Sequence, residues 1–88
     1  MSDNDGFIME LVKDMRAERL MEFIKNFMEA NHYAPTYTEM MAGVEEKSKK
    51  GIFDSLNRLE SQGRIKRVPG KSRALRILNV YPVVESED

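Results

Sequence analysis

Ten of the fourteen Lys and Arg residues of this 88-residue chain lie within residues 47–76. Only Asp54 and Glu60 are acidic there, so this stretch carries a formal charge of +8 and the rest carries −9. Cations gathered in one part of a chain whose net charge is −1 indicate a surface built for a polyanion. The alternative is an ordinary solvated lysine-rich surface, which the scarcity of acids over this stretch disfavours.

No other chemistry is indicated by the residue types. The chain has no cysteine, which excludes disulfides, thiolate zinc sites and a cysteine nucleophile. His32 is the single histidine and has no carboxylate cluster near it in sequence, so we interpret it as a loop residue rather than a metal ligand. The Ser, Thr and acidic residues lack the base and orienting group of a catalytic site. We therefore expect no metal, no cofactor and no enzymatic activity.

The composition predicts one small globular domain. Hydrophobic residues make up 41% and charged residues 33% of the chain, which is typical of a folded domain rather than a disordered one. No apolar run approaches the length of a membrane span, and the acidic start MSDNDG lacks the basic residues of a signal peptide.

Apolar residues recur at helical spacing in two sets, from Phe7 to Met15 and from Leu20 to Met28. Their phase slips around residues 16–19, which favours either one long bent helix or a short helix followed by a longer one. We expect residues 1–6 to be mobile and the helix to end near Asn31, which tolerates the left-handed conformation.

A short second helix, a turn, a third helix and a hairpin follow. Thr36 and Glu39 have capping-box spacing, which predicts a helix over residues 37–42 with Gly43 as its stop. Ser48 is a good N-cap for a third helix that ends at Gly63. This helix presents three apolar residues on one face (Ile52, Leu56 and Leu59). Pro69 and Gly70 mark a turn between two short strands.

This order predicts a mainly α fold with a small β-hairpin, a winged helix-turn-helix with an extra N-terminal helical segment. We divide the chain into a partly helical N-terminal extension (1–16), a winged-helix DNA-binding domain (17–79) and an acidic C-terminal tail (80–88). The third helix would enter the major groove, where base edges are distinguishable. The basic hairpin would reach phosphates or the minor groove.

Residues 17–78 resemble the winged-helix DNA-binding domain of LexA repressors. The shared elements are P-T-x-x-E from Pro35, the Ser that opens the third helix, L-x-x-L-x-x-x-G-x-I from Leu56, and G-x-S-R from Gly70. The resemblance implies a winged helix that binds double-stranded DNA.

The third helix departs from the family pattern. The family usually reads S-P-N-A-A-E-E where this chain reads SKKGIFD, so Lys50 stands at the base-reading Asn and Phe53 at the first Glu. We therefore expect a different target sequence. LexA repressors also carry a self-cleaving C-terminal domain that dimerises the protein. Because this chain ends at Asp88, we expect neither self-cleavage nor that means of dimerisation.

The predicted DNA-binding residues come from the third helix and the hairpin. Lys50 and Asn57 would donate to base acceptors, Asp54 would accept from cytosine N4, and Gly51 would allow close approach. Lys71 and Arg73 at the hairpin tip are the strongest phosphate or minor-groove candidates. The full set is Ser48, Lys49, Lys50, Gly51, Asp54, Asn57, Arg58, Lys71, Ser72 and Arg73. Electrostatic support would come from Lys47, Lys66, Arg67 and Arg76.

Each of these assignments has a plain alternative. The helix residues would also suit the solvent face of an amphipathic helix, and the hairpin cations would also aid solubility or protect an edge strand. Arg67 is expected to point outward and add charge. Phe53 is expected to pack partly into the core rather than contact a thymine methyl group.

The N-terminal extension leaves two alternatives open. Its apolar residues would form a homodimer or partner surface, or the helix would fold back to complete a small core. These residues are Phe7, Ile8, Leu11, Val12 and Met15. Residues 80–84 would suit either role.

The main hypothesis is a small bacterial or phage transcriptional regulator in the cytoplasm, associated with the nucleoid. A rival is a winged-helix protein–protein interaction module that uses its N-terminal helix and acidic flanks. A third is an accessory subunit of a nucleic-acid enzyme.

Overall fold

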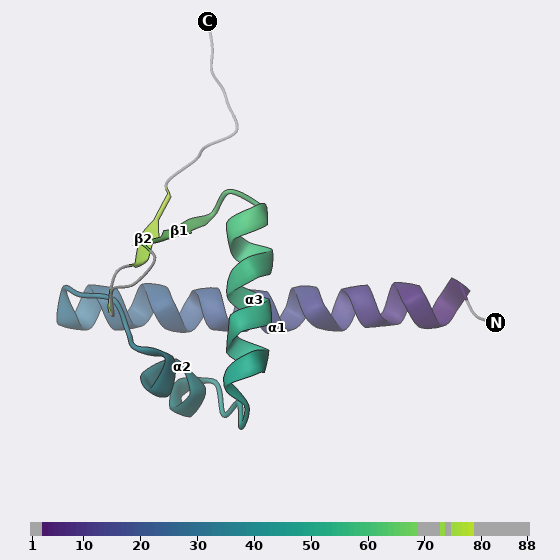
Figure 1. Ribbon diagram of the computed structural model, residues 1–88, viewed down its shortest axis with the longest axis horizontal. Helices are drawn as coiled ribbons and strands as arrows, with labels where there is room; N and C mark the ends of the chain where they lie inside the picture. Colours follow the sequence, from purple (N-terminus) through teal and green to yellow (C-terminus); the bar gives the residue numbers. More distant parts are fainter. Residues whose placement is uncertain (1–2, 69–72, 74, 79–88) are drawn as a thin grey trace, which may run out of the picture.

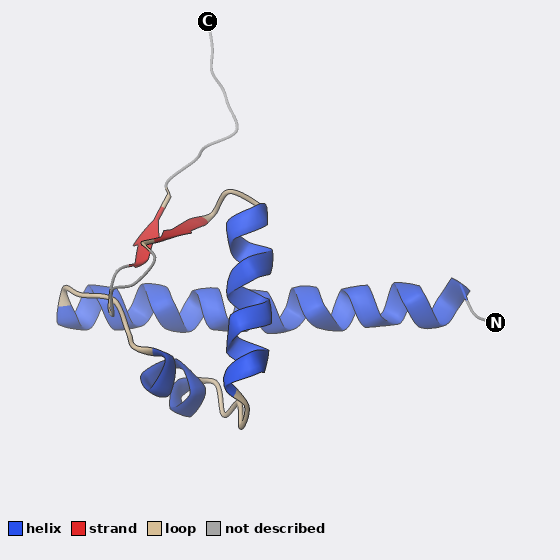
Figure 2. Cartoon of the chain, viewed as in Figure 1, coloured by secondary structure: helices blue, strands red, loops and turns tan. Residues whose placement is uncertain are grey.

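The computed structural model describes residues 3–68, 73 and 75–78, in the order helix, helix, helix, hairpin. The helices are α1 (Asp3–Asn31), α2 (Tyr37–Gly43) and α3 (Lys49–Ser61), and the strands are β1 (Ile65–Arg67) and β2 (Leu75–Ile77). In Figures 1 and 2, α3 crosses α1 near its middle, while α2 and the hairpin gather beside the C-terminal half of α1. The winged helix-turn-helix fold predicted from the sequence is confirmed.

α1 is one continuous helix, so the alternative of two helices is wrong. The helix begins at Asp3, so residues 3–6, which we expected to be mobile, lie in regular structure. Ala17, Leu20 and Ile24 are buried, whereas most apolar residues before Arg16 are exposed. The phase slip in the apolar pattern therefore marks where α1 leaves the core and is not a break in the helix.

α1 ends at Asn31, as predicted, but the left-handed conformation follows one residue later than expected. That conformation is taken by His32, with φ of 66°, rather than by Asn31, which is the last helical residue. The His32 N–H donates to Met28 O at 2.8 Å, and Asn31 Nδ2 donates to Phe27 O at 2.9 Å. The asparagine amide thus satisfies a carbonyl of the last turn from within the helix.

The predicted helix caps are confirmed. Thr36 Oγ1 accepts from the Glu39 N–H at 3.1 Å, and Glu39 Oε1 accepts from the Thr36 N–H at 2.9 Å, which completes the capping box. Ser48 Oγ accepts from the Gly51 N–H at 2.9 Å at the start of α3. These bonds satisfy helix N–H groups that have no partner within the helix.

The core lies where α3 crosses α1. The predicted residues Ile52, Leu56 and Leu59 are at most 1% exposed, and they pack with residues of α1, α2 and the hairpin. The buried core residues are Ala17, Leu20, Met21, Ile24, Ala34, Met40, Ile52, Leu56, Leu59, Ile65 and Leu75. Gly43 lets α2 approach α1 closely, because a Cβ there would overlap the ring of Phe23.

The hairpin is antiparallel and pairs Ile65 with Ile77, Lys66 with Arg76, and Arg67 with Leu75. Ile65 and Leu75 are buried and Ile77 packs against the core. The hairpin is thus anchored by its apolar side, as predicted for Leu75 and Ile77, and its other side is exposed.

Candidate nucleic-acid interface

The exposed face of α3 carries polar side chains opposite its buried stripe. Lys50, Asp54 and Asn57 are exposed, as predicted. Lys50 Nζ lies 2.8 Å from Asp54 Oδ2, one helical turn away. Both side chains are more than half exposed, so a competing ligand can replace this bond at little cost.

Gly51 does not present open backbone. The Glu46 carboxylate covers the Cα of Gly51. A Cβ added at Gly51 would lie within 2.8 Å of the carboxylate atoms of Glu46. Glu46 Oε2 also accepts from the Ser48 N–H at 3.3 Å. A carboxylate at the start of α3 is favoured by the helix dipole. The Glu46 carboxylate therefore lies where DNA was predicted to approach the backbone of Gly51 closely.

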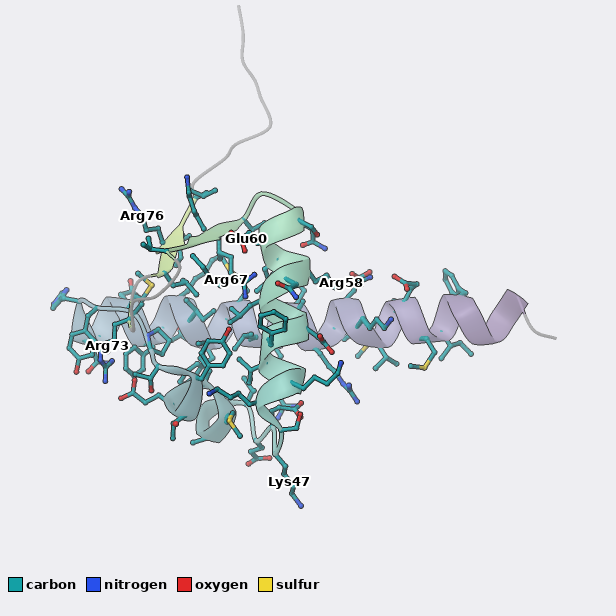
Figure 3. All side chains as sticks on the ribbon, in the orientation of Figure 1. Lys47, Arg58, Glu60, Arg67, Arg73 and Arg76 are labelled. Carbon is teal, nitrogen blue, oxygen red and sulfur yellow. The ribbon has the colours of Figure 1, made fainter. Side chains whose placement is uncertain are left out.

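Arg58 turns toward α1 rather than outward from α3 (Figure 3). Its Nη2 lies 2.6 Å from Glu10 Oε1, and its Nε donates to Asp14 Oδ1 at 2.7 Å. The hydrogen bond from Arg58 lowers the pKa of the Glu10 carboxyl. Its predicted outward position on the DNA face is therefore wrong, because two acids of the N-terminal segment hold the guanidinium.

Arg67 does not point outward, contrary to the prediction. Figure 3 shows it beside Glu60, between the hairpin and α3. Its Nη2 lies 2.6 Å from Glu60 Oε1, and the same nitrogen donates to Asn57 Oδ1. The hydrogen bond from Arg67 lowers the pKa of the Glu60 carboxyl. Arg67 therefore ties β1 to α3 and adds little free charge.

Arg73 does not project from the hairpin tip as predicted. Nη1 and Nη2 donate to Glu39 Oε1 and Oε2, each at 2.9 Å, and Nη1 also donates to Ala34 O at 2.9 Å. The guanidinium carbon lies 4.5 Å from the ring centroid of Tyr33. The hydrogen bond from Arg73, followed by that from the Thr36 N–H, lowers the pKa of the Glu39 carboxyl. Arg73 thus fastens the hairpin to the start of α2.

Other predicted cations keep their charge available. Lys66 and Arg76 are exposed and stand directly opposite each other on the hairpin. Within the part of the chain that the structure describes, they form no ion pair, and neither do Lys47 and Lys49. Lys47 and Arg76 point away from the protein body in Figure 3. Lys71 and Ser72 lie outside the described residues.

Phe53 is not packed into the core as expected. It is 47% exposed and, with Tyr37, Lys49 and Lys50, lines a shallow open hollow beside the start of α3. Its apolar type favoured burial in the sequence, but Ile52, Leu56 and Leu59 complete the buried face without it.

No local signal in the sequence indicated two cations of α1 that lie beside the predicted DNA face. Lys13 and Arg16 border an open groove with residues of α3, among them Asp54 and Asn57. Only the crossing of α1 and α3 brings them beside the predicted DNA-reading residues.

The N-terminal apolar residues do not fold back onto the core. Phe7, Ile8, Leu11 and Met15 are 68%, 53%, 48% and 63% exposed, and Val12 is half-buried. The segment projects past the crossing with α3 (Figure 1). The alternative in which these four residues complete the core is therefore wrong.

The described residues contain neither a metal-ligand cluster nor a membrane-spanning helix. Across residues 3–68, 73 and 75–78, no three His, Asp or Glu side chains are grouped as metal ligands. Over the same part of the chain, no helix combines the length and hydropathy that a membrane span requires.

Comparison with known proteins gives one consistent family. The family model described as LexA DNA binding domain matches residues 12–74. The chain is 32% identical over 65 residues to the LexA repressor of Moorella thermoacetica, which covers 74% of this chain and 32% of that protein. It is 35% identical over 78 residues to the LexA repressor of Syntrophomonas wolfei. That alignment covers 89% of this chain and 38% of the S. wolfei protein. The chain spans about a third of the length of these curated relatives.

Proposed function

Because the chain belongs to the LexA DNA-binding domain family, we propose that it binds double-stranded DNA sequence-specifically and regulates transcription. α3 would enter the major groove and the hairpin would contact phosphates. As a DNA-binding regulator, the protein would act at the nucleoid in the cytoplasm. The observation that carries the proposal is the pairing of Lys66 with Arg76 on the exposed side of the hairpin.

This pair is unfavourable unless an anion is present. Like charges directly opposite each other on two strands destabilise a sheet by some tenths of a kcal/mol. A phosphate between Lys66 and Arg76 would remove the repulsion and gain two charge-assisted bonds. Arg58, Arg67 and Arg73 are already paired with acids of the same chain. Phosphate binding is therefore assigned to Lys66 and Arg76, with Lys47 and Lys49 at the start of α3.

Salt dependence of duplex binding tests this assignment. Each lost phosphate contact lowers the slope of log K against log [salt] by about 0.9. We expect Lys66→Ala and Arg76→Ala each to reduce the slope by about that amount. Lys25→Ala removes an exposed lysine of α1 outside the proposed interface, and it should leave the slope unchanged. Parental slopes for both hairpin variants would refute the assignment.

Sequence reading is assigned to Lys50, Asp54 and Asn57 on the exposed face of α3. Selection of bound duplexes from random DNA would give the target and the spacing of any half-sites. Lys50→Ala should then change the preferred base at one position more than it weakens binding overall. An equal loss on all sequences would assign Lys50 to phosphate instead.

We also propose that the N-terminal part of α1 pairs with a second copy. Five exposed apolar residues lie there (Phe7, Ile8, Met9, Leu11 and Met15). The bonds of Arg58 to Glu10 and Asp14 hold this segment against α3. A segment already held in place loses little entropy on association. A dimer would bring two α3 helices to two half-sites.

Sedimentation separates the dimer from a rival function. Leu11→Asp should reduce the mass of a dimer to that of a monomer, whereas Asn26→Asp, an exposed site of α1 outside the segment, should not. If the parent protein is a monomer with and without DNA, the dimer proposal is refuted. The rival, an interaction module for another protein that uses the same apolar segment and the acidic flanks, would then be favoured.

A further inference from the structure

Phe53 is an apolar side chain placed among hydrogen-bonding and charged ones. It lies in the first half of α3, and nearly half of its surface is exposed. Lys50, Asp54 and Asn57, the residues assigned to base reading, lie within four positions of it on the same helix. The core is complete without it, since three other α3 residues are fully buried. Its exposure is therefore not explained by packing.

The ring is held in position from one side. The guanidinium carbon of Arg67 lies 5.4 Å from the Phe53 ring centroid. Arg67 is itself bonded to Glu60 and Asn57, so the stacked cation is fixed by both α3 and β1. Phe53 also lines a hollow together with Tyr37, Lys49 and Lys50. Phe53 thus presents a positioned apolar surface with cations around it.

The major groove offers one apolar group to such a surface. Base edges there carry hydrogen-bond donors and acceptors, and the exception is the C5-methyl group of thymine. A Phe side chain has no hydrogen-bonding group, so it discriminates bases there by contact with that methyl. We propose that Phe53 is a specificity-determining residue that reads a C5-methylpyrimidine in the major groove. This inference rests on the proposed function and extends it to one base of the target.

Replacing thymine by uracil removes only the methyl group. The duplex selected by the full chain is remade with uracil at one thymine position at a time, and affinities are measured at one salt concentration. Removing one buried methyl group lowers affinity about fourfold. We expect a loss of this size at one position for the parent chain. Phe53→Ala should bind the thymine and uracil duplexes equally, and Phe53→Leu should retain part of the difference.

Two controls keep the result specific. Tyr33→Ala removes another exposed aromatic ring that lies beside a guanidinium but outside α3, and it should keep the parental ratio of thymine to uracil affinity. A duplex with cytosine at the sensitive position should regain affinity when that base is 5-methylcytosine, which separates the methyl group from the thymine O4 atom. Circular dichroism checks that each variant is folded.

Three results would overturn the inference. The first is a parent chain that binds every uracil duplex as well as the thymine duplex. The second is a methyl effect that persists in Phe53→Ala, and the third is equal affinity for cytosine and 5-methylcytosine. In each case DNA binding itself would stand. A parent chain that binds no duplex would instead refute the proposed function.

Discussion

Gly43→Ala should destabilise the protein although alanine favours helices. An added Cβ would lie within 2.5 Å of three ring atoms of Phe23, whereas real Cβ atoms essentially never come closer than 3.0 Å. The ring or α2 must therefore move by roughly 0.5–1 Å. Overpacking of this kind costs about 1–3 kcal/mol, which corresponds to a fall in Tm of about 4–8 °C per kcal/mol in a domain of this size.

The Phe23 ring has little freedom to move away. It packs against the buried core, and its centroid lies 5.8 Å from that of Phe27. Phe23→Leu should remove the overlap, so Gly43→Ala should cost much less in that background. A double-mutant cycle measured by urea unfolding gives this coupling directly.

Gly6→Ala is the matched control for the same chemical change. Gly6 lies in α1 with nothing within 4 Å of an added Cβ, so only the helix propensity changes. This substitution should leave stability unchanged or raise it by up to about 1 kcal/mol. A Gly43→Ala variant as stable as the Gly6→Ala variant would show that the close contact of α2 with α1 does not require glycine.

Three further perturbations test other contacts. Arg73 and the Thr36 N–H lower the folded-state pKa of Glu39, so the ionised carboxylate should stabilise the fold at neutral pH. This stability should be lost as the pH falls below the usual glutamate pKa of about 4.3. In Glu39→Gln, the urea midpoint should therefore fall less on acidification than in the parent. Ser48→Ala should cost about 1 kcal/mol in thermal unfolding, and Ser48→Asp should retain most of it, since both Ser and Asp cap helices. Leu56→Ala should cost about 2–5 kcal/mol in urea unfolding, because the side chain is fully buried. Unchanged midpoints in these variants would contradict the respective roles.

The helix-turn-helix could be predicted because its signals are local. The capping box joins Thr36 to Glu39, the Ser48 cap reaches Gly51, and the apolar stripe of α3 repeats every three or four residues. Each of these interactions spans no more than one helical turn. Their residue types and spacing are therefore sufficient to predict them.

The partners of the arginines could not be predicted in this way. Arg73 is 34 residues from Glu39, and Arg58 is 48 residues from Glu10. Any exposed acid is an equally plausible partner until the elements are packed together. From the sequence, these arginines were predicted to contact DNA, whereas in the structure their guanidinium groups are bonded to acidic residues of the same chain.

By itself, the sequence determined the order of elements, the caps, the buried face of α3 and the concentration of positive charge in residues 47–76. The tertiary structure decided which of those charges stay available: Lys66 and Arg76 stand together, while Arg67 and Arg73 are paired. It also decided that Phe53 is exposed and that the start of α1 projects beyond the core. The physical reason is that periodicity defines a face of one helix, whereas the crossing of α1 and α3 selects which parts of that face meet a neighbour.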